Sequence, residues 1–200
     1  MTALEAALWQ QGYVHVAGID EAGRGALAGP VVAAAVILPQ GLVIPGVDDS
    51  KKLRRPARER LFSTISAQAL AVAVCMRSPA QIDAANILQA TLQAMREAAG
   101  ALCIPPDYIL IDGNRAFAGS PWPLRTVTRG DARCQSIAAA SIIAKVSRDR
   151  IMHDLHALHP EYGWLTNAGY PTRTHYAALA TYGPTHYHRK SFRLKARHRA

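Results

Sequence analysis

Apolar and polar positions follow two alternating patterns along this chain. Short runs rich in valine and isoleucine, bounded by glycine or proline, predict strands, and apolar residues three or four positions apart predict helices. The predicted strands cover residues 14–19, 31–38, 69–76, 108–111 and, with a weaker pattern, 125–128. The predicted helices cover residues 55–66, 79–100, 131–158 and 174–181.

Local signals place several of these boundaries. Ser78 is followed by Pro79 and then by Gln81, which is the arrangement of a helix cap with a first-turn proline and a capping box. Pro160 stops the long helix that we expect to begin at Asp131. With 200 residues, half of them apolar, and neither an internal repeat nor a clear linker, we expect a single domain over residues 1–200.

Positive charge is the main compositional bias. The formal net charge is +9 and the isoelectric point is near 9.9, which suits a polyanionic partner. Part of this charge lies in a basic C-terminal segment at about 183–200, which we expect to bind phosphate. A second group, at 51–55, follows Asp48-Asp49-Ser50; a solvated face and a phosphate contact are equally compatible with it.

The cysteines and the apolar runs indicate the cellular location of the protein. Cys75, Cys103 and Cys134 are odd in number and far apart, so neither a disulfide framework nor a zinc ribbon is indicated, and a reducing cytoplasm fits. The longest uninterrupted apolar run, 31–38, is too short to cross a bilayer. We therefore expect a cytoplasmic protein without a membrane segment.

Acidic residues at strand ends suggest a metal site. Asp20 and Glu21 follow the first predicted strand, Asp112 follows the fourth, and Asp131 comes where the long helix should begin. Adjacent carboxylates repel each other unless a cation lies near them, and Mg²⁺ and Mn²⁺ prefer oxygen ligands. Taken singly, Asp112 could be an Asp-Gly turn residue and Asp131 a helix cap. Together, the four acids point to a nuclease that uses divalent metal.

Other motifs are weaker. Residues 23–28 match the spacing G-x-G-x-x-A of dinucleotide-binding loops, but Gly29-Pro30 and a strand-like run follow instead of the helix that such a loop requires. Residues 18–25 are spaced like a Walker phosphate-binding loop, but they lack the lysine of that motif. Histidines recur at 153, 156 and 159, where zinc is conceivable and favourable contact with the helix end is the commoner explanation.

Several ordered motifs resemble bacterial ribonuclease HII. The resemblance runs from about residue 14 to 194. The motifs are Gly18-Ile19-Asp20-Glu21-Ala22-Gly23-Arg24-Gly25, Asp48-Asp49-Ser50-Lys51-Lys52-Leu53, the segment 86–91, Ile111-Asp112-Gly113-Asn114-Arg115, Gly130-Asp131, the segment 138–149, Gly169-Tyr170-Pro171-Thr172, Gly183-Pro184-Thr185 and His188-Arg189-Lys190-Ser191-Phe192.

This resemblance implies a ribonuclease H-like α/β fold, with a mixed central sheet flanked by helices and a helical C-terminal portion. It also implies a metal-binding catalytic quartet, a reader of the ribose 2′-hydroxyl, and further substrate contacts. The quartet comprises Asp20, Glu21, Asp112 and Asp131, the reader comprises Gly23, Arg24, Gly25 and Tyr170, and the further contacts are Ser50, Lys51 and Arg189. By its residue type alone, Tyr170 could equally be a buried aromatic.

The implied activity is that of a monomeric endoribonuclease. Its partners would be RNA–DNA hybrids and duplex DNA with embedded ribonucleotides, cut on the 5′ side of the ribonucleotide to leave 3′-hydroxyl and 5′-phosphate ends. Two Mg²⁺ or Mn²⁺ ions would activate water and stabilise the leaving oxygen. The chain departs from the family pattern at Asn167-Ala168, where a His-Lys pair is common, and in a longer stretch between Asp112 and Gly130. Another nuclease of the same superfold and a non-catalytic nucleic-acid-binding module are the alternatives.

Overall fold

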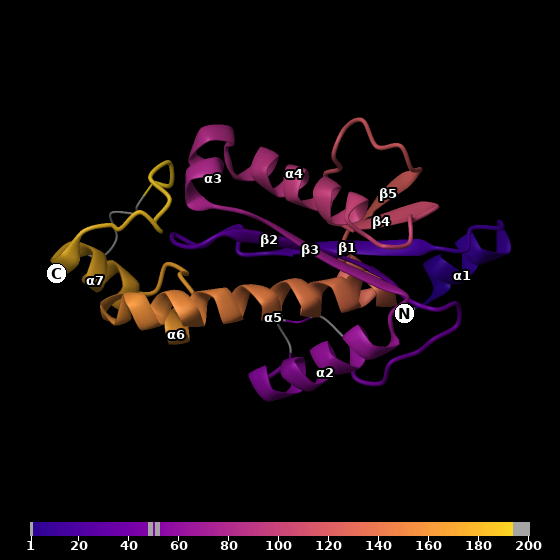
Figure 1. Ribbon diagram of the computed structural model, residues 1–200, viewed down its shortest axis with the longest axis horizontal. Coiled ribbons are helices and arrows are strands. Elements are labelled where there is room, and N and C mark those ends of the chain that lie inside the picture. Colours follow the sequence, from indigo (N-terminus) through magenta and orange to yellow (C-terminus); the bar gives the residue numbers. More distant parts are fainter. Residues whose placement is uncertain (1, 48–49, 51–52, 194–200) are drawn as a thin grey trace.

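The computed structural model describes residues 2–47, 50 and 53–193 and contains a mixed sheet with helices on both faces (Figure 1). The sheet has five strands in the order β3-β2-β1-β4-β5. β1 pairs antiparallel with β2 and parallel with β4. The strands are β1 Val16–Ala22, β2 Val31–Ile37, β3 Ala71–Arg77, β4 Tyr108–Asp112 and β5 Leu124–Val127.

The helices form layers above and below this sheet (Figure 1). α3 and α4 cover one face, α5 covers the other, and α2 packs on the outer side of α5. Short 3-10 turns η1 and η2 lie on either side of α5. The bounds are α1 Ala3–Gln10, α2 Arg55–Gln68, α3 Pro79–Ala85, α4 Ile87–Gly100, η1 Gly130–Ala132, α5 Gln135–Leu158, η2 Pro160–Tyr162, α6 Trp164–Asn167 and α7 Arg173–Tyr182.

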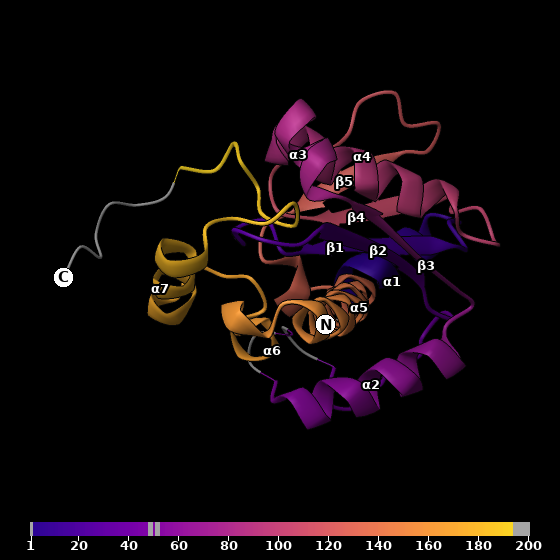
Figure 2. The ribbon, with the colours of Figure 1, turned by 60° about the vertical axis from the view of Figure 1, so that its left-hand side comes forward.

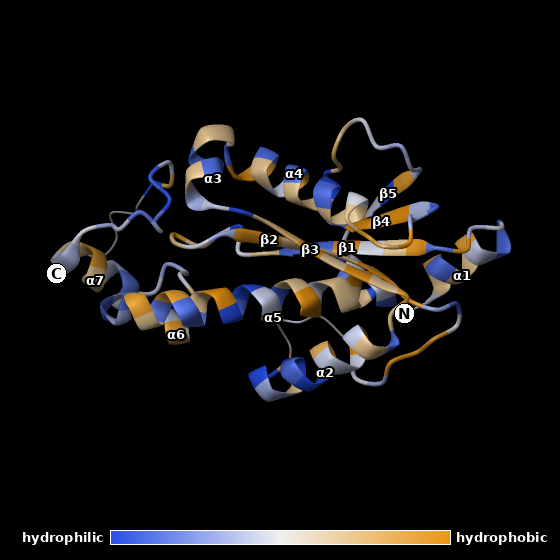
Figure 3. Cartoon of the chain, in the orientation of Figure 1, coloured by the Kyte–Doolittle hydropathy of each residue, from blue (hydrophilic) through white to orange (hydrophobic). Residues whose placement is uncertain are grey.

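Two apolar cores separate these layers. One lies between the sheet and α4 and includes Ile19, Ile111 and Met95; the other lies between the sheet and α5 and includes Val36 and Ile143. The mainly orange strands and the polar positions of α2 in Figure 3 show the same division. β2 is buried at every position because both layers cover it, which explains its uninterrupted apolar sequence.

The C-terminal portion folds back toward β1 and β2. After α7, the chain returns to the sheet, as Figure 2 shows, and His188 forms an isolated bridge with Ala28. The mixed α/β sheet, the flanking helices and the helical C-terminal portion are all confirmed.

Two predicted helices need correction. The helix expected over 79–100 is broken at Asn86, whose φ of 70° and ψ of 160° are not helical, and whose side chain caps α4 by accepting from the Gln89 N–H. The long helix begins at Gln135 and not at Asp131, because η1 comes first. Asp131 is therefore not the N-cap of α5; that position belongs to Cys134.

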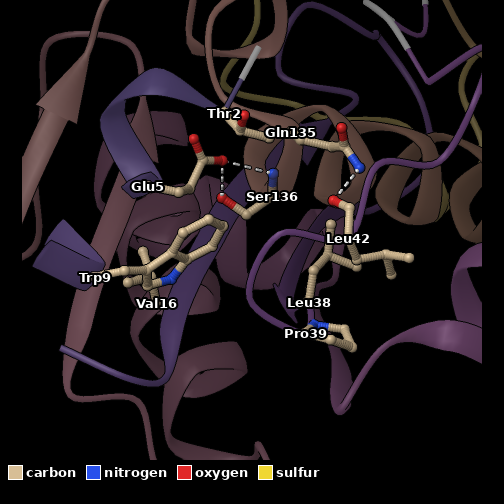
Figure 4. Close-up of a pocket in the computed structure, with 9 residues that line it drawn as sticks. All are labelled: Thr2, Glu5, Trp9, Val16, Leu38, Pro39, Leu42, Gln135 and Ser136. Atoms are coloured by element: carbon tan, nitrogen blue, oxygen red, sulfur yellow. Dashed lines mark hydrogen bonds between the residues drawn. The ribbon is translucent and has the colours of Figure 1, made fainter. Parts of the chain in front are cut away.

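α1 was not predicted, although it anchors the start of α5. Glu5 is buried, and its Oε1 accepts from the backbone N–H of Ser136 at 3.0 Å and from the Ser136 hydroxyl at 2.9 Å (Figure 4). A carboxylate at a helix N-terminus satisfies an otherwise open N–H group and complements the helix dipole. α1 thus fixes the end of the longest helix in the described residues.

Candidate active site

Parallel pairing of β1 and β4 brings the predicted acidic residues together. Ile19 is opposite Ile111, so the next residues, Asp20 near the end of β1 and Asp112 at the end of β4, lie beside each other on neighbouring strands. β1 was predicted to end at Ile19, but it continues through Asp20 and Glu21 to Ala22. The expected convergence of strands is therefore seen for Asp20 and Asp112.

Asp20 is almost completely buried, between its acidic neighbours and α5. Burial raises the pKa of Asp20 well above its ordinary value, and the charges of Glu21 and Asp112 raise it further. Hydrogen bonds from the Glu21 N–H, at 2.7 Å, and from Ser141 oppose this rise in pKa. The Ser141 hydroxyl is also 2.8 Å from that of Ser50, so Ser50 is linked to Asp20 through one side chain.

Glu21 opens onto a cleft between the end of β4 and the start of α4. The Arg24 guanidinium, half exposed, lies 3.3 Å from Glu21 Oε1. The cleft places exposed positive charge beside the carboxylates. Its lining comprises Glu21, Arg24, Leu88, Thr91, Leu92, Met95, Asp112, Gly113, Asn114 and Arg115.

Asp131 approaches the same edge from η1. The N–H of the preceding residue, Gly130, donates to Asp112 Oδ1 at 2.7 Å. A side chain at position 130 would put its Cβ 3.1 Å from that oxygen and 2.5 Å from Ile137 Cδ1, so Ile137 would have to shift. Asp131 is buried, and the residue before it, Gly130, is the one that contacts Asp112 directly.

The donor set suits a divalent cation. It offers hard carboxylate oxygens, and the repulsion that raises the Asp20 pKa is what a bound cation would relieve. Across the described part of the chain, no three His, Cys, Asp or Glu side chains are gathered tightly enough to enclose an ion. One reason is visible in β1, where Asp20 and Glu21 are consecutive and therefore point to opposite faces of the strand.

The Gly-Arg-Gly loop lies against the segment that carries Tyr170. The Leu27 N–H donates to the Gly169 carbonyl at 2.8 Å, and a Cβ built on Gly25 would lie 4.0 Å from the Tyr170 ring. The loop and Tyr170, predicted together as a ribose reader, are thus adjacent. Tyr170 is partly exposed, so it is not the buried aromatic residue that the sequence alone also allowed.

The other predicted substrate contacts have varied positions. Ser50 is buried against Ser141. Lys51 and the end of the basic segment, 194–200, lie outside the described residues. Arg189 is 3% exposed, and its guanidinium donates to the Gly29 and Arg24 carbonyls, so the visible role of Arg189 is to hold the loop.

Two further groups around Tyr170 were missed. Arg148 is fully buried and donates to carbonyls of both the 28–30 and 168 segments. A signal existed, because Arg148 continues the buried stripe of α5 that contains Ser141, Ala144 and Met152 at helical spacing. A charged residue on an apolar stripe is unusual and marks a buried polar contact.

The second missed group is a pair of buried histidines. His175 Nε2 accepts from Trp164 Nε1–H at 3.2 Å, so Nδ1 carries the proton and donates to the Tyr170 carbonyl at 3.0 Å. His188 Nε2 is 3.1 Å from the same acceptor and must donate to it, while its Nδ1 accepts from the Thr185 N–H. These two neutral rings therefore hold the main chain of Tyr170 through its carbonyl group.

Comparison with known proteins identifies the family. The model of the family "Ribonuclease HII" matches residues 17–195. The chain is 53% identical to ribonuclease HII of Salinibacter ruber over 97% of this chain and 98% of that protein. It is 56% identical to ribonuclease HII of Geobacter metallireducens over 92% of this chain and 86% of that protein.

A solved structure shares the fold. The ribonuclease H2 of Pyrococcus horikoshii superposes with a TM-score of 0.77 at 27% identity, covering 90% of this chain and 94% of that one. The sequence matches and the shared fold therefore agree with the family resemblance that the ordered motifs indicated. The chain belongs to the ribonuclease HII family and is a ribonuclease of the ribonuclease H type 2 class.

Proposed function

We propose that this ribonuclease cuts the RNA strand of RNA–DNA hybrids and incises duplex DNA on the 5′ side of an embedded ribonucleotide. The products would carry 3′-hydroxyl and 5′-phosphate ends. Membership of the ribonuclease HII family supports an endoribonuclease. The observation that carries the site assignment is the parallel pairing that sets Asp20 beside Asp112 at one edge of the sheet.

The four carboxylates of Asp20, Glu21, Asp112 and Asp131 would hold two divalent ions, Mg²⁺ or Mn²⁺. When bound, such ions supply an activated water and neutralise charge on the leaving oxygen. Ser141 and the Glu21 N–H would keep Asp20 oriented, and the Gly130 N–H would do so for Asp112. No protein nucleophile is needed, because water is the attacking group.

Ribose recognition would take place between Gly25 and Tyr170. The φ of Gly25 is not in the left-handed region, and an added Cβ would meet only the Tyr170 ring at 4.0 Å. Nothing in the described protein therefore demands a glycine there, whereas a sugar that approached the main chain closely would. A tyrosine hydroxyl and backbone groups can bind a 2′-hydroxyl, which distinguishes RNA from DNA.

Positive groups around the cleft would hold the phosphates. Arg24 is exposed beside the acids, and the sequence adds Lys51 and the basic C-terminal segment. The net charge of +9 supports a nucleic-acid partner. We expect such an enzyme to work in the cytoplasm, and the free thiols of Cys75, Cys103 and Cys134 are compatible with a reducing compartment.

The test is the variant Asp112→Asn, which removes a ligand charge while it keeps the shape of the side chain. Hybrid cleavage should fall by about a hundredfold or more, because several kcal/mol of charge stabilisation are lost. Affinity for an uncut hybrid should change by no more than about threefold, since the cationic groups remain.

Asp154→Asn is the matched control, because Asp154 lies on α5 with a side chain that is 85% exposed. That variant should cleave like the parent protein. Near-normal cleavage by Asp112→Asn would contradict the proposed catalytic set.

A further inference from the structure

Two buried arginines lie behind the loop and tyrosine to which we assign ribose recognition. Arg148 comes from α5 and Arg189 from the segment after α7. They are 0% and 3% exposed. In the described chain neither forms a salt bridge with a carboxylate; both guanidiniums are satisfied by backbone carbonyls.

Arg148 joins two segments that are far apart in the sequence. Its Nε donates to the Pro30 carbonyl at 2.9 Å, and its Nη2 donates to the Ala28 carbonyl at 3.0 Å. On its other edge, Nη1 donates to the Ala168 carbonyl at 2.9 Å. One planar group therefore fixes the separation between the loop and the turn that leads to Tyr170.

The surroundings of Arg148 tie it to the two sides of the candidate reader. Its guanidinium carbon lies 5.3 Å from the centre of the Tyr170 ring, in a cation–π contact. A Cβ on Gly23 would lie 2.0 Å from Arg148 Nε, so the loop packs directly on this side chain. A shift of the guanidinium would move both Gly23 and Tyr170.

Arg189 holds the loop from the other end. Its Nε and Nη2 both donate to the Gly29 carbonyl, at 3.1 and 2.9 Å, and its Nη1 donates to the Arg24 carbonyl at 2.9 Å. Its own backbone N–H donates to the Leu27 carbonyl. Several carbonyls of the loop thus point inward, toward the two guanidiniums.

This arrangement is costly for stability alone. Burying a guanidinium without a carboxylate partner carries a large desolvation penalty, which its hydrogen bonds must offset. Burial lowers the pKa of Arg148, and it lowers the pKa of Arg189 to about 9, with the charge of Arg148 contributing. What arginine provides here is a rigid planar fork with five donors, which neither lysine nor an apolar side chain reproduces.

We propose that Arg148 and Arg189 are positioning residues that set the width of the space between the Gly25 main chain and the Tyr170 ring, and through it the rate at which a ribonucleotide is cut. This inference rests on the proposed function. Neither arginine would touch the substrate through its side chain; each acts through the backbone that it holds.

The test is a double-mutant cycle between Arg148→Lys and Tyr170→Phe. Single-turnover rates are measured on duplex DNA with one ribonucleotide, and affinity is measured separately on an uncut duplex. Arg148→Lys should slow cleavage by about tenfold to a hundredfold, the cost of a misplacement of about 1 Å, with affinity changed by less than about threefold.

The fold-losses in cleavage rate caused by the two substitutions should not multiply in the double variant. If Arg148 acts through Tyr170, the double variant should be within about threefold of the slower single variant. A purely structural arginine would leave the rate of the folded protein unchanged or give multiplicative effects, and either result would overturn the proposal. Arg150→Lys, on the same helix but half exposed and paired with Glu59, is the control and should cleave normally.

Folding is monitored by thermal denaturation, and rates are taken well below the midpoint. If Arg148→Lys does not fold, the same cycle is run with Arg189→Lys. Failure of both to fold would assign the pair to stability and overturn the positioning role. A parent protein that cuts neither this duplex nor a long hybrid would contradict the proposed function itself, which keeps the two failures distinct.

Discussion

Gly23 and Gly25 flank the same arginine, but glycine serves a different purpose at each position. Gly23 has a φ of 96°, and a side chain there would collide with Arg148. Gly25 has room for a methyl group, and its φ is not in the left-handed region. The first glycine is therefore required by the fold, whereas no contact in the described fold requires the second.

Alanine substitutions should separate these roles. Gly23→Ala should lower the free energy of unfolding by about 2 kcal/mol or more, through strain and overpacking. Gly25→Ala should change it by less than about 1 kcal/mol, while cleavage at a single ribonucleotide falls about tenfold or more, because the methyl group occupies space meant for the sugar. Denaturation curves and cleavage rates check both. A fully active Gly25→Ala variant would contradict the reader assignment.

The His175–His188 pair predicts a pH dependence of stability. Burial lowers the pKa of both, and the pKa of His188 falls from 6.5 to about 4. The unfolded chain binds protons first as pH falls below about 6.5, so the contribution is complete above that pH and is lost as pH falls toward 4. The loss from His188 is at most about 3 kcal/mol.

His188→Gln tests this dependence. The variant removes the titrating ring, so its free energy of unfolding should fall less steeply between pH 7 and pH 4.5 than that of the parent protein. His153→Gln, at an exposed position, should keep the parent slope. Equal slopes for the parent protein and His188→Gln would contradict the buried neutral pair.

Among the elements, the crossing of β1 and α5 is where a glycine comes closest to the backbone of another element. A Cβ on Gly18 would lie 2.1 Å from the Ser136 carbonyl carbon. Because that obstacle is backbone, the two elements would have to separate. The crossing therefore sets how closely α5, which carries Ser141 and Arg148, can approach Asp20 in β1.

Gly18→Ala should cost about 3 kcal/mol or more in the free energy of unfolding, if the protein folds at all. Gly100→Ala is the matched control, because Gly100 ends α4 with nothing within 4 Å of an added Cβ. Alanine there should be neutral or stabilise by up to about 1 kcal/mol. Urea denaturation measures both variants, and a mild effect at Gly18 would contradict the close crossing.

At this scale, sequence patterns succeeded where periodicity or capping was strong. All five strands and the capping box of Ser78 and Gln81 are confirmed. The break at Asn86 was not foreseen, since apolar periodicity continues across it and only the local backbone angles end the helix. α6 is too short for a periodic pattern, and η1 displaced the start of α5 by a few residues.

For the molecule as a whole, the acidic strand ends could be predicted because strands are recognisable locally and parallel ends meet at one edge. Most of the supporting layer could not: His188 lies in a basic stretch that gives no sign of burial, and only the apolar stripe of α5 marked Arg148. Within the described residues, no helix is of the length and apolarity that a bilayer crossing requires. The single domain and the monomeric state stay predictions.

The most direct test of the central claim is incision of a labelled DNA duplex that carries one ribonucleotide, with Mg²⁺, with Mn²⁺ and with a chelator, beside an all-DNA duplex. We predict cutting immediately 5′ of the ribonucleotide, only with metal and only in the duplex that contains it. Cutting that persists in chelator would contradict the carboxylate metal site. Equal cutting of the all-DNA duplex would contradict ribose recognition by Gly25 and Tyr170.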